Sequence, residues 1–357
     1  MAERKNTCYS GIGGQAVLEG VMMMNQDKYA IAVRKPDGEI EVKIDTHKGI
    51  LSDKKFRKFP FIRGIFNFVD SLTLGTKCLN YSASFYEEEG KETAFDKALN
   101  KISKGKGESI ISGIVTMFSI ILAIGLFIIL PYFLSSLLKG YILNRSLIAI
   151  VEGLIRIAIF ILYVWGISAM KDIKRLYMYH GAEHKCINCL ERGRELNVKN
   201  AKRSSRLHKR CGTSFMFFVL FVSIILFFFI RVDNPVYKVL LRIALMPVVA
   251  GISYEIIRLA GRTDSILIKL LSAPGMAIQR MTTKEPDEDM IEVAIAAIEA
   301  VYDWEEFLRD NFDYEEYPDD SAAANAQASD EDSDDSEDED NLDDKEISDN
   351  GLEEVEI

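Results

Sequence analysis

The chain has 357 residues, a formal net charge of −11 and a hydrophobic fraction of 48%. Residues 318–357 contain 18 acidic residues and one lysine, so residues 1–317 carry a net charge of +6. The acidity therefore lies in the tail, and no basic patch with interleaved aromatic residues indicates a nucleic-acid partner. The hydrophobic residues lie in long runs, which predict a membrane protein rather than a soluble one.

Residues 1–109 predict a cytoplasmic region. The chain begins without an apolar segment and cleavage site, so no signal peptide is expected. A glycine-rich segment, GIGGQAVLEGVMMM at 11–24, precedes residues 29–44, whose apolar and polar side chains alternate on both sides of Pro36-Asp37-Gly38 and predict a β-hairpin. Residues 59–86 place apolar side chains on one face and predict a helix at the membrane interface.

Four membrane spans are expected between residues 110 and 260. The runs at 110–138 and 213–230 carry no charge, over lengths that suit a bilayer core of about 30 Å. The segments 146–170 and 236–260 are also long enough, but they contain charged residues. These include Glu152, Arg156, Arg242, Glu255 and Arg258. We expect these side chains to face the bundle interior, with Glu152 paired to Arg156 and Glu255 to Arg258 through helical spacing.

The charge of the connections predicts the orientation of the spans. The loop at 171–211 has twelve basic and four acidic residues, whereas the connections at 139–145 and 231–238 have two basic residues each. Because basic loops stay in the cytoplasm, the His- and Cys-containing loop 171–211 is predicted to be cytoplasmic. With four spans, both termini lie on that same side.

Residues 261–317 predict cytoplasmic interfacial and amphipathic helices. A short apolar segment is expected to be broken by Pro274-Gly275, and an amphipathic helix is expected to begin near Pro286. The acidic residues 318–357 predict a disordered tail. The expected fold class is a mainly α membrane protein with about four transmembrane helices, cytoplasmic interfacial helices and a small N-terminal β-hairpin.

The residues most typical of a chemical site lie in MYHGAEHKCINCLERG, at 178–193. A helix would place His180 and His184 on one face, where both imidazoles suit one zinc ion. Glu183 completes the order His-x-x-Glu-His, the inverted form of a zinc-protease motif whose glutamate is the general base. His208 and Cys211 follow in SRLHKRCGTSF, so three of the four histidines fall within 29 residues.

Further candidate residues accompany these five. Cytoplasmic thiols stay reduced, so the cysteines favour metal binding or burial over disulfides, and Cys186 and Cys189 form a C-x-x-C pair of additional candidate ligands. Gln15 and Glu19 are the polar residues of the glycine-rich segment, which lacks the lysine of a phosphate-binding loop. Structural roles remain the alternative, since interfacial histidines can bind backbone or lipid and glycine-rich segments can simply pack.

Six separated motifs are distributed over residues 9–305. They are GGQAVLEGVMMM, YAIAVRKPDGEI, IRGIFNFVDSL, YHGAEHK, SRLHKRCGTSF and PGMAIQRMTTKEPDEDMIEVAI. In this order they resemble the motifs of the YqhQ-like family, a bacterial membrane family of unknown function that is labelled a predicted metal-dependent enzyme. The resemblance implies a multi-pass protein of the bacterial cytoplasmic membrane. It also implies that certain residues belong to the family pattern, namely His180, Glu183, His184, His208, Cys211, Gln15, Glu19 and Glu191. Cys186 and Cys189 are not required by that pattern.

Three functional hypotheses remain open. The first is a metal-dependent, hydrolytic enzyme in which His180, His184 and either His208 or Cys211 hold Zn²⁺ or another divalent transition metal, with Glu183 as catalytic base. The second is a membrane adaptor or regulator with a closed, four-ligand structural site. The third is a transporter with a polar path through the charged residues of the spans. The expected partners are the lipid bilayer and a substrate or protein of undetermined kind, and the oligomeric state is left open.

Overall fold

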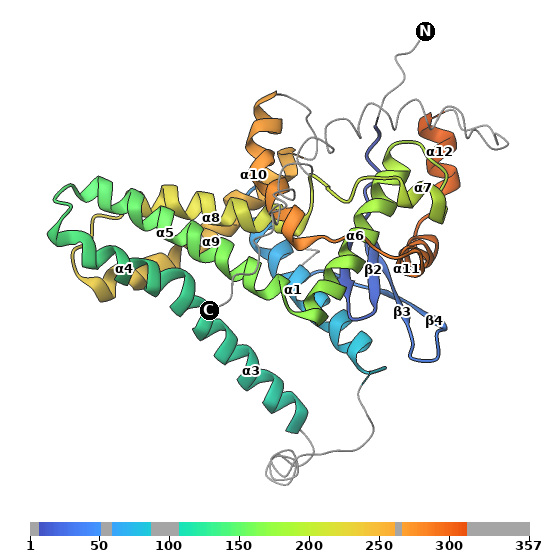
Figure 1. The fold of residues 1–357 in the computed structure, drawn as a ribbon, viewed down its shortest axis with the longest axis horizontal. Coiled ribbons are helices and arrows are strands. Elements are labelled where there is room, and N and C mark those ends of the chain that lie inside the picture. The colour runs from blue at the N-terminus through green and yellow to red at the C-terminus, as the bar shows by residue number, and fades with distance from the viewer. Residues whose placement is uncertain (1–6, 51–58, 87–106, 261–265, 313–357) are drawn as a thin grey trace, which may run out of the picture. The chain divides into compact units, whose positions relative to one another are not determined.

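The computed structural model describes residues 7–50, 59–86, 107–260 and 266–312 (Figure 1). Within these ranges the chain is mainly helical, with one small antiparallel sheet near its N-terminus. The mainly α fold class that the sequence predicts is therefore confirmed. The acidic tail predicted at 318–357 lies outside the described residues.

Helices make up most of the described residues. Their bounds, in chain order, are α1 (Ile62–Ala83), α3 (Gly107–Ile124), the π-helix η2 (Gly125–Ile129), α4 (Leu130–Leu137), the 3₁₀ turn η3 (Leu138–Gly140), α5 (Arg145–Ser168), α6 (Lys171–Glu191), α7 (Val198–Lys202), α8 (Gly212–Phe228), α9 (Pro235–Ala260), α10 (Ile266–Thr282), α11 (Glu288–Glu299) and α12 (Trp304–Phe312).

Four strands form an antiparallel meander in the order β1-β2-β3-β4. Their bounds are β1 (Gly13–Val17), β2 (Gly20–Asn25), β3 (Lys28–Arg34) and β4 (Ile40–Thr46). The predicted hairpin is present as β3 and β4, and Gly38, at a φ of 91°, permits the turn between them. The glycine-rich segment, for which no strand was predicted, supplies β1 and β2.

Helices cover both faces of this sheet, so the central strands are buried on both sides. Met22 of β2 and Tyr29 and Ile31 of β3 pack with Leu74 and Cys78 of α1. The alternate residues of the same strands point to the opposite face, where α6 contacts β1 and β2, and α11 contacts β2 and β3. The sheet therefore supports α6, the helix that carries the histidine motif (Figure 1).

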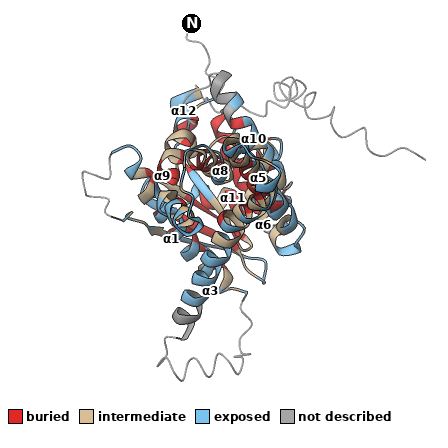
Figure 2. Ribbon diagram, turned by 90° about the vertical axis from the view of Figure 1, so that its left-hand side faces the viewer, coloured by how far each residue is buried: buried red, intermediate tan, exposed pale blue. Residues whose placement is uncertain are grey.

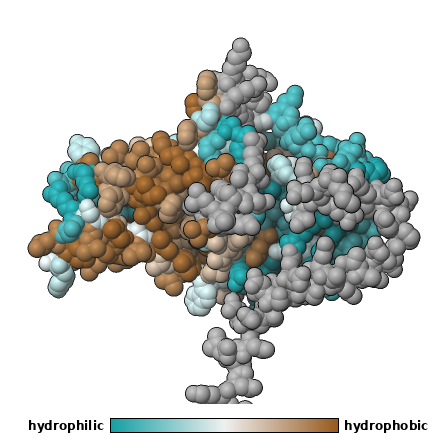
Figure 3. Space-filling model, turned by 90° about the horizontal axis from the view of Figure 1, so that it is seen from above, coloured by the Kyte–Doolittle hydropathy of each residue, from teal (hydrophilic) through white to brown (hydrophobic). Residues whose placement is uncertain are grey.

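Three helical stretches are long and apolar enough to cross a membrane: 113–140, 145–168 and 235–260. The remaining predicted span, at 213–230, corresponds to α8, an apolar helix of 17 residues. The described side chains of α3 are largely exposed (Figure 2). Figure 3 shows hydrophobic residues gathered over α4, α5, α8 and α9, with hydrophilic residues at the end of the molecule that holds the sheet and a smaller hydrophilic group at the opposite end.

Buried ion pairs join the apolar helices. The predicted pair of Glu152 and Arg156 is present, with the Glu152 Oε1 to Arg156 Nη2 distance at 2.9 Å, and Arg242 of α9 donates to the other oxygen of Glu152 at 2.9 Å. The predicted pair of Glu255 and Arg258 is not the main contact of that carboxylate. Arg63 of α1 forms a two-pronged ion pair with Glu255 instead, because α1 packs directly against α9.

The C-terminal elements differ in two respects from the sequence prediction. The segment expected to break at Pro274 is one helix, α10, that continues through it, because Gly275 lets α10 pack closely on Ser214 of α8. The following helix begins after Asp287 rather than at Pro286, and the apolar residues of its predicted face, including Ile291 and Ile298, are buried.

Candidate metal centre

Two separate segments of the chain bring the candidate ligands together. His180, Glu183 and His184 lie on one side of α6, as their three- and four-residue spacings predict. His208 and Cys211 lie in the irregular segment that leads into α8. Cys211 is the N-cap of α8, and its Sγ accepts a hydrogen bond from the Thr213 amide at 3.4 Å. The start of α8 therefore fixes the position of this thiol.

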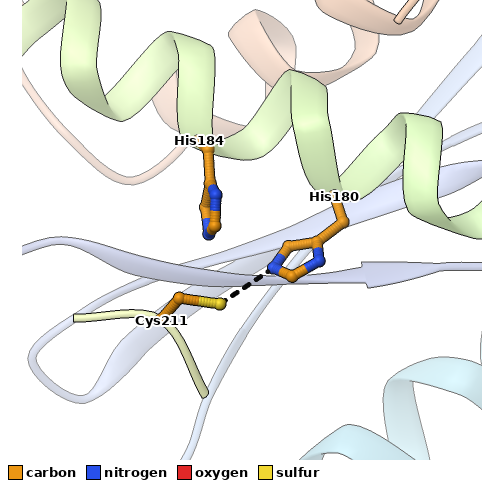
Figure 4. A group of neighbouring side chains, drawn as sticks. All are labelled: His180, His184 and Cys211. Carbon is orange, nitrogen blue, oxygen red and sulfur yellow. Dashed lines mark hydrogen bonds between the residues drawn. The ribbon is translucent and has the colours of Figure 1, made fainter. Parts of the chain in front are cut away.

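Three residues present ligand atoms to one point (Figure 4). His180, His184 and Cys211 each offer one atom, and these atoms all lie within 4.8 Å of one another. His180 Nε2 lies 3.1 Å from Cys211 Sγ. Ligand atoms around a tetrahedral zinc ion are separated by about 3.5 Å, given zinc bond lengths of about 2.0 to 2.3 Å. The three side chains therefore need only small movements to hold one ion.

The second nitrogen of each imidazole is held by a backbone carbonyl. His180 Nδ1 lies 2.9 Å from the Thr282 carbonyl oxygen, and His184 Nδ1 lies 2.5 Å from the Arg206 carbonyl oxygen. A carbonyl only accepts hydrogen bonds, so each Nδ1 carries the proton and each Nε2 keeps a free lone pair. Zinc-binding histidines in proteins have this same arrangement, in which an outer partner fixes the tautomer and the ring orientation.

Glu183 places its carboxylate beside both free nitrogens. Its Oε2 lies 3.8 Å from His180 Nε2 and 3.9 Å from His184 Nε2. Burial raises the pKa of Glu183 to about 7, although His180 and the Gly14 amide oppose the shift. A side chain at position 14 would collide with this glutamate, since a Cβ there would lie 2.8 Å from the Glu183 Cγ. The glycine in β1 therefore makes room for the carboxylate.

His208 lies beside the three converging ligands but has other partners. Its ring centre is 5.5 Å from that of His184, while its Nε2 lies 3.2 Å from Arg210 Nη2 and 3.7 Å from Glu191 Oε2. Burial lowers the pKa of His208 to about 4, so the ring is neutral at pH 7. Its Nε2 then accepts the Arg210 hydrogen bond, and this leaves Cys211 as the third converging ligand.

Glu191 organises the surroundings of His208. Its carboxylate accepts hydrogen bonds from the Ser10 amide and hydroxyl and forms an ion pair with Arg210. Burial alone would raise the pKa of Glu191, but His208 and Arg210 outweigh that effect and hold it below its usual value. Glu191 thus connects α6 to the N-terminal segment rather than to the three converging ligands.

The two polar residues of the glycine-rich segment lie outside the converging group. Glu19, in the turn between β1 and β2, forms a two-pronged ion pair with Arg175 and accepts a hydrogen bond from the Tyr179 hydroxyl. Gln15 lies on β1 against Gly75 of α1, where only a glycine leaves room for its amide. Both residues dock the sheet onto helices.

The C-x-x-C cysteines also have separate surroundings. Cys189 Sγ lies 3.3 Å from the Glu195 carbonyl oxygen, and Cys186 faces the Ile291 carbonyl of α11 at 4.0 Å. Burial raises the pKa of Cys189 to about 12 and that of Cys186 well above its usual value. Both thiols therefore stay protonated at neutral pH and pack as small apolar side chains.

Sequence reasoning missed the residues that support the ligands. The fully buried amide of Gln279 in α10 accepts from the His208 amide and donates to the His208 carbonyl and to Ser214. Gln279 thereby clamps the segment that carries His208 and Cys211. Its one signal in the sequence is an uncharged polar residue within the apolar stretch PGMAIQRM. The carbonyl partners of the histidines have no signal, because every residue carries a carbonyl.

Comparison with known proteins agrees with the resemblance in the sequence motifs. The family described as "Protein of unknown function (DUF1385)" matches residues 59–304, a range that contains all three converging ligands. "Uncharacterized protein YqhQ" from Bacillus subtilis (strain 168) is 36% identical over 285 residues, which cover 79% of this chain and 89% of that protein. No solved structure matches the chain. The chain therefore belongs to the DUF1385 family, the YqhQ-like family of proteins of unknown function.

Proposed function

We propose that the protein is a zinc-dependent, hydrolytic enzyme with its site at the cytoplasmic surface of a bacterial membrane. The observation that carries the proposal is the convergence of His180, His184 and Cys211 within 4.8 Å, with the Glu183 carboxylate beside them. This donor set suits Zn²⁺ and other divalent transition metals that bind imidazole and thiolate ligands.

The number of converging ligands supports catalysis. Catalytic zinc sites have three protein ligands and keep a fourth position for water or substrate, whereas structural sites have four ligands. The ion would supply a Lewis acid that polarises the substrate. Glu183 would take a proton from the attacking water and pass it to the leaving group.

The proposed membrane placement follows from the apolar helices. We assign four spans, formed by the stretch from α3 to η3 and by α5, α8 and α9, with the lipid bilayer as partner of their exposed apolar side chains. α8 rises about 26 Å over its 17 residues, close to the thickness of the hydrocarbon core. An even number of spans and the basic loop 171–211 support a cytoplasmic location for the sheet, α6 and the metal centre.

A structural metal is the second candidate, and the position of Cys211 favours it. Cys211 caps α8 while both histidines lie on α6, so an ion held by all three would pin these helices together. With Glu183 as a fourth ligand the site would be closed, as in the adaptor or regulator hypothesis. Transport has less support, because the carboxylates that would line a polar path are already paired, Glu152 with Arg156 and Arg242, and Glu255 with Arg63.

Glu183→Gln distinguishes the enzyme from the structural site. The amide keeps the size of the side chain but cannot take up a proton, so zinc content should stay at the wild-type level while hydrolysis falls by about 100-fold or more. Activity is measured on a panel of model esters, phosphoesters and peptides, together with zinc content by mass spectrometry. Glu195→Gln, at an exposed position close to the end of α6, is the matched control.

Two other results of this experiment would contradict the enzyme proposal. Full activity of Glu183→Gln with zinc still bound would show that this carboxylate is not the base. Loss of zinc from Glu183→Gln, with Glu195→Gln unaffected, would show that Glu183 is a fourth ligand and would favour the closed structural site.

A further inference from the structure

A second polar site lies one helix length away from the metal centre. Cys211 marks the start of α8, whereas Phe227 and Phe228 at its end line a cavity of about 290 Å³. The other walls of this cavity come from Tyr132 of α4, from η3 and the turn after it, from the start of α5, and from the α8–α9 connection and the start of α9. In the proposed topology the cavity lies at the membrane surface opposite the cytoplasm.

Basic side chains predominate in the walls. Five of them line the cavity, against two carboxylates, and both carboxylates already have partners. The basic residues are Lys139, Arg145, Arg231, Lys238 and Arg242. Asp233 lies 3.4 Å from Arg145, and Glu152 is held between Arg156 and Arg242. An ion pair requires a nitrogen–oxygen distance of 4.0 Å or less. Among the described residues, no carboxylate lies that close to the ammonium group of Lys139 or Lys238.

Three of these cations converge on the ring of Tyr132. The ammonium groups of Lys139 and Lys238 lie 5.5 and 5.3 Å from the ring centre, and the guanidinium carbon of Arg242 lies 5.4 Å from it. The ring attracts each cation, but cations this close together repel one another. An anion among them would remove that repulsion, so the arrangement suits a negatively charged ligand.

The buried part of this wall also carries an unused hydrogen-bond donor. Arg242 is only 2% exposed, and its Nε has no acceptor among the described residues. Buried donors in folded proteins are nearly always satisfied by protein, water or ligand. The guanidinium fork of arginine matches the oxygens of a phosphate. Arg242 therefore points to a ligand with several acceptor oxygens.

Apolar side chains also lie at the rim of the cavity. Leu143 is 93% exposed, and Ile142, Ile148, Phe228 and Ile230 also line the opening. We infer that this cavity binds a phosphate group, with Lys139, Lys238 and Arg242 around its oxygens. The phosphate can belong to an anionic lipid, whose acyl chains the apolar rim would contact, or to a free phosphate. This site does not depend on the metal centre.

Calorimetric titration of the full-length protein in an uncharged detergent tests the inference. The probes are inorganic phosphate, dioctanoyl phosphatidylglycerol and, as a lipid without phosphate, dioctanoylglycerol. Lys139→Gln/Lys238→Gln removes two cavity charges and should raise the dissociation constant of the phosphate-bearing probe about tenfold or more. Lys171→Gln/Lys174→Gln, which removes two exposed charges from the start of α6, is the control and should bind as the wild type does.

The probes also identify the source of the phosphate. Comparable binding of inorganic phosphate and the lipid would indicate a free phosphate ligand, while binding of phosphatidylglycerol alone would indicate a lipid headgroup. Failure of both phosphate probes to bind the wild type would overturn the inference, as would equal binding by the cavity variant or binding of dioctanoylglycerol as tight as that of the phospholipid. If the double variant does not fold, Arg231→Gln at the exposed rim, which should also weaken binding, replaces it.

Discussion

The free nitrogens of His180 and His184 depend on backbone carbonyls that hold the opposite side of each ring. The four-residue spacing of the two histidines is visible in the sequence, because it follows from helical geometry alone. Their outer partners are the carbonyls of Thr282 and Arg206, which lie 102 and 22 positions further along the chain. Only the tertiary fold brings these groups together.

The choice between His208 and Cys211 as third ligand was also beyond the sequence. Both residues lie in an irregular segment, where spacing does not determine the direction of a side chain, so the sequence left both open. The structure directs Cys211 toward the histidine pair through its N-cap position, while Arg210 and Glu191 occupy His208. The ligand assignment itself stays a prediction until metal binding is measured.

Thiol labelling tests the assigned surroundings of the cysteines. Burial raises the pKa of Cys78 to about 11 and that of Cys189 to about 12, so neither should form a reactive thiolate at pH 8. Cys8 is partly exposed and should react with iodoacetamide in the folded protein. Peptide mass spectrometry after brief labelling should therefore find Cys8 modified and Cys78 and Cys189 unmodified. Rapid labelling of either buried thiol would contradict the packing of α1 or α6.

The position of α6, which carries two of the proposed ligands, depends on its close contact with the segment before α11. A Cβ at position 181 would lie 2.1 Å from the Lys284 carbonyl oxygen, so Gly181→Ala forces α6 away from this segment. We expect a loss of about 1 to 3 kcal/mol in the free energy of unfolding, as for other overpacked sites. Thermal unfolding of the detergent-purified protein measures the change.

Gly166→Ala in α5 is the matched control for this substitution. Among the described residues, no atom outside the local helix backbone lies within 4 Å of a Cβ at position 166. Alanine is also the better helix former by about 1 kcal/mol, so this variant should be as stable as the wild type or more so. Equal effects of the two substitutions would show that the loss reflects helix propensity or the membrane environment rather than the contact with Lys284.

The β1–β2 hairpin shows why some elements were missed from the sequence. The hairpin at β3 and β4 was predictable from its alternation of apolar and polar residues around a recognisable turn. β1 and β2 lack that alternation, since β1 is rich in glycine and β2 is buried on both faces with three consecutive methionines. The continuous α10 was missed for the converse reason, because Pro274 is a local signal that helix packing overrides.

The proposed orientation of the whole molecule can be tested by cysteine accessibility. Leu143→Cys lies in the exposed turn between α4 and α5 and should react with a membrane-impermeant maleimide in intact cells. Lys174→Cys lies at the exposed start of α6 and should react only after the membrane is permeabilised. Site-specific peptides distinguish both from the native thiols. The reverse pattern, or reaction of both sites in intact cells, would contradict four spans with a cytoplasmic metal centre.

Hydropathy made the apolar helices predictable, because a bilayer-length run needs no tertiary information. Three of the four predicted spans have matching helices of sufficient length, and α8 is the shorter fourth. The partners of the charged residues were less predictable. Glu152 and Arg156 pair within one helix, as their spacing indicates, but Arg242 and Arg63 come from other helices, and sequence spacing contains no information on such contacts.

The zinc content of the purified full-length protein tests the central claim most directly. Mass spectrometry after purification without chelators should find about one zinc ion per chain, in agreement with the one converging ligand set among the described residues. His180→Ala, His184→Ala and Cys211→Ala should each lose it, while Cys189→Ala, which removes a buried thiol outside the set, should retain it. A wild type without metal, or Cys211→Ala with full zinc content, would contradict the assignment of this site.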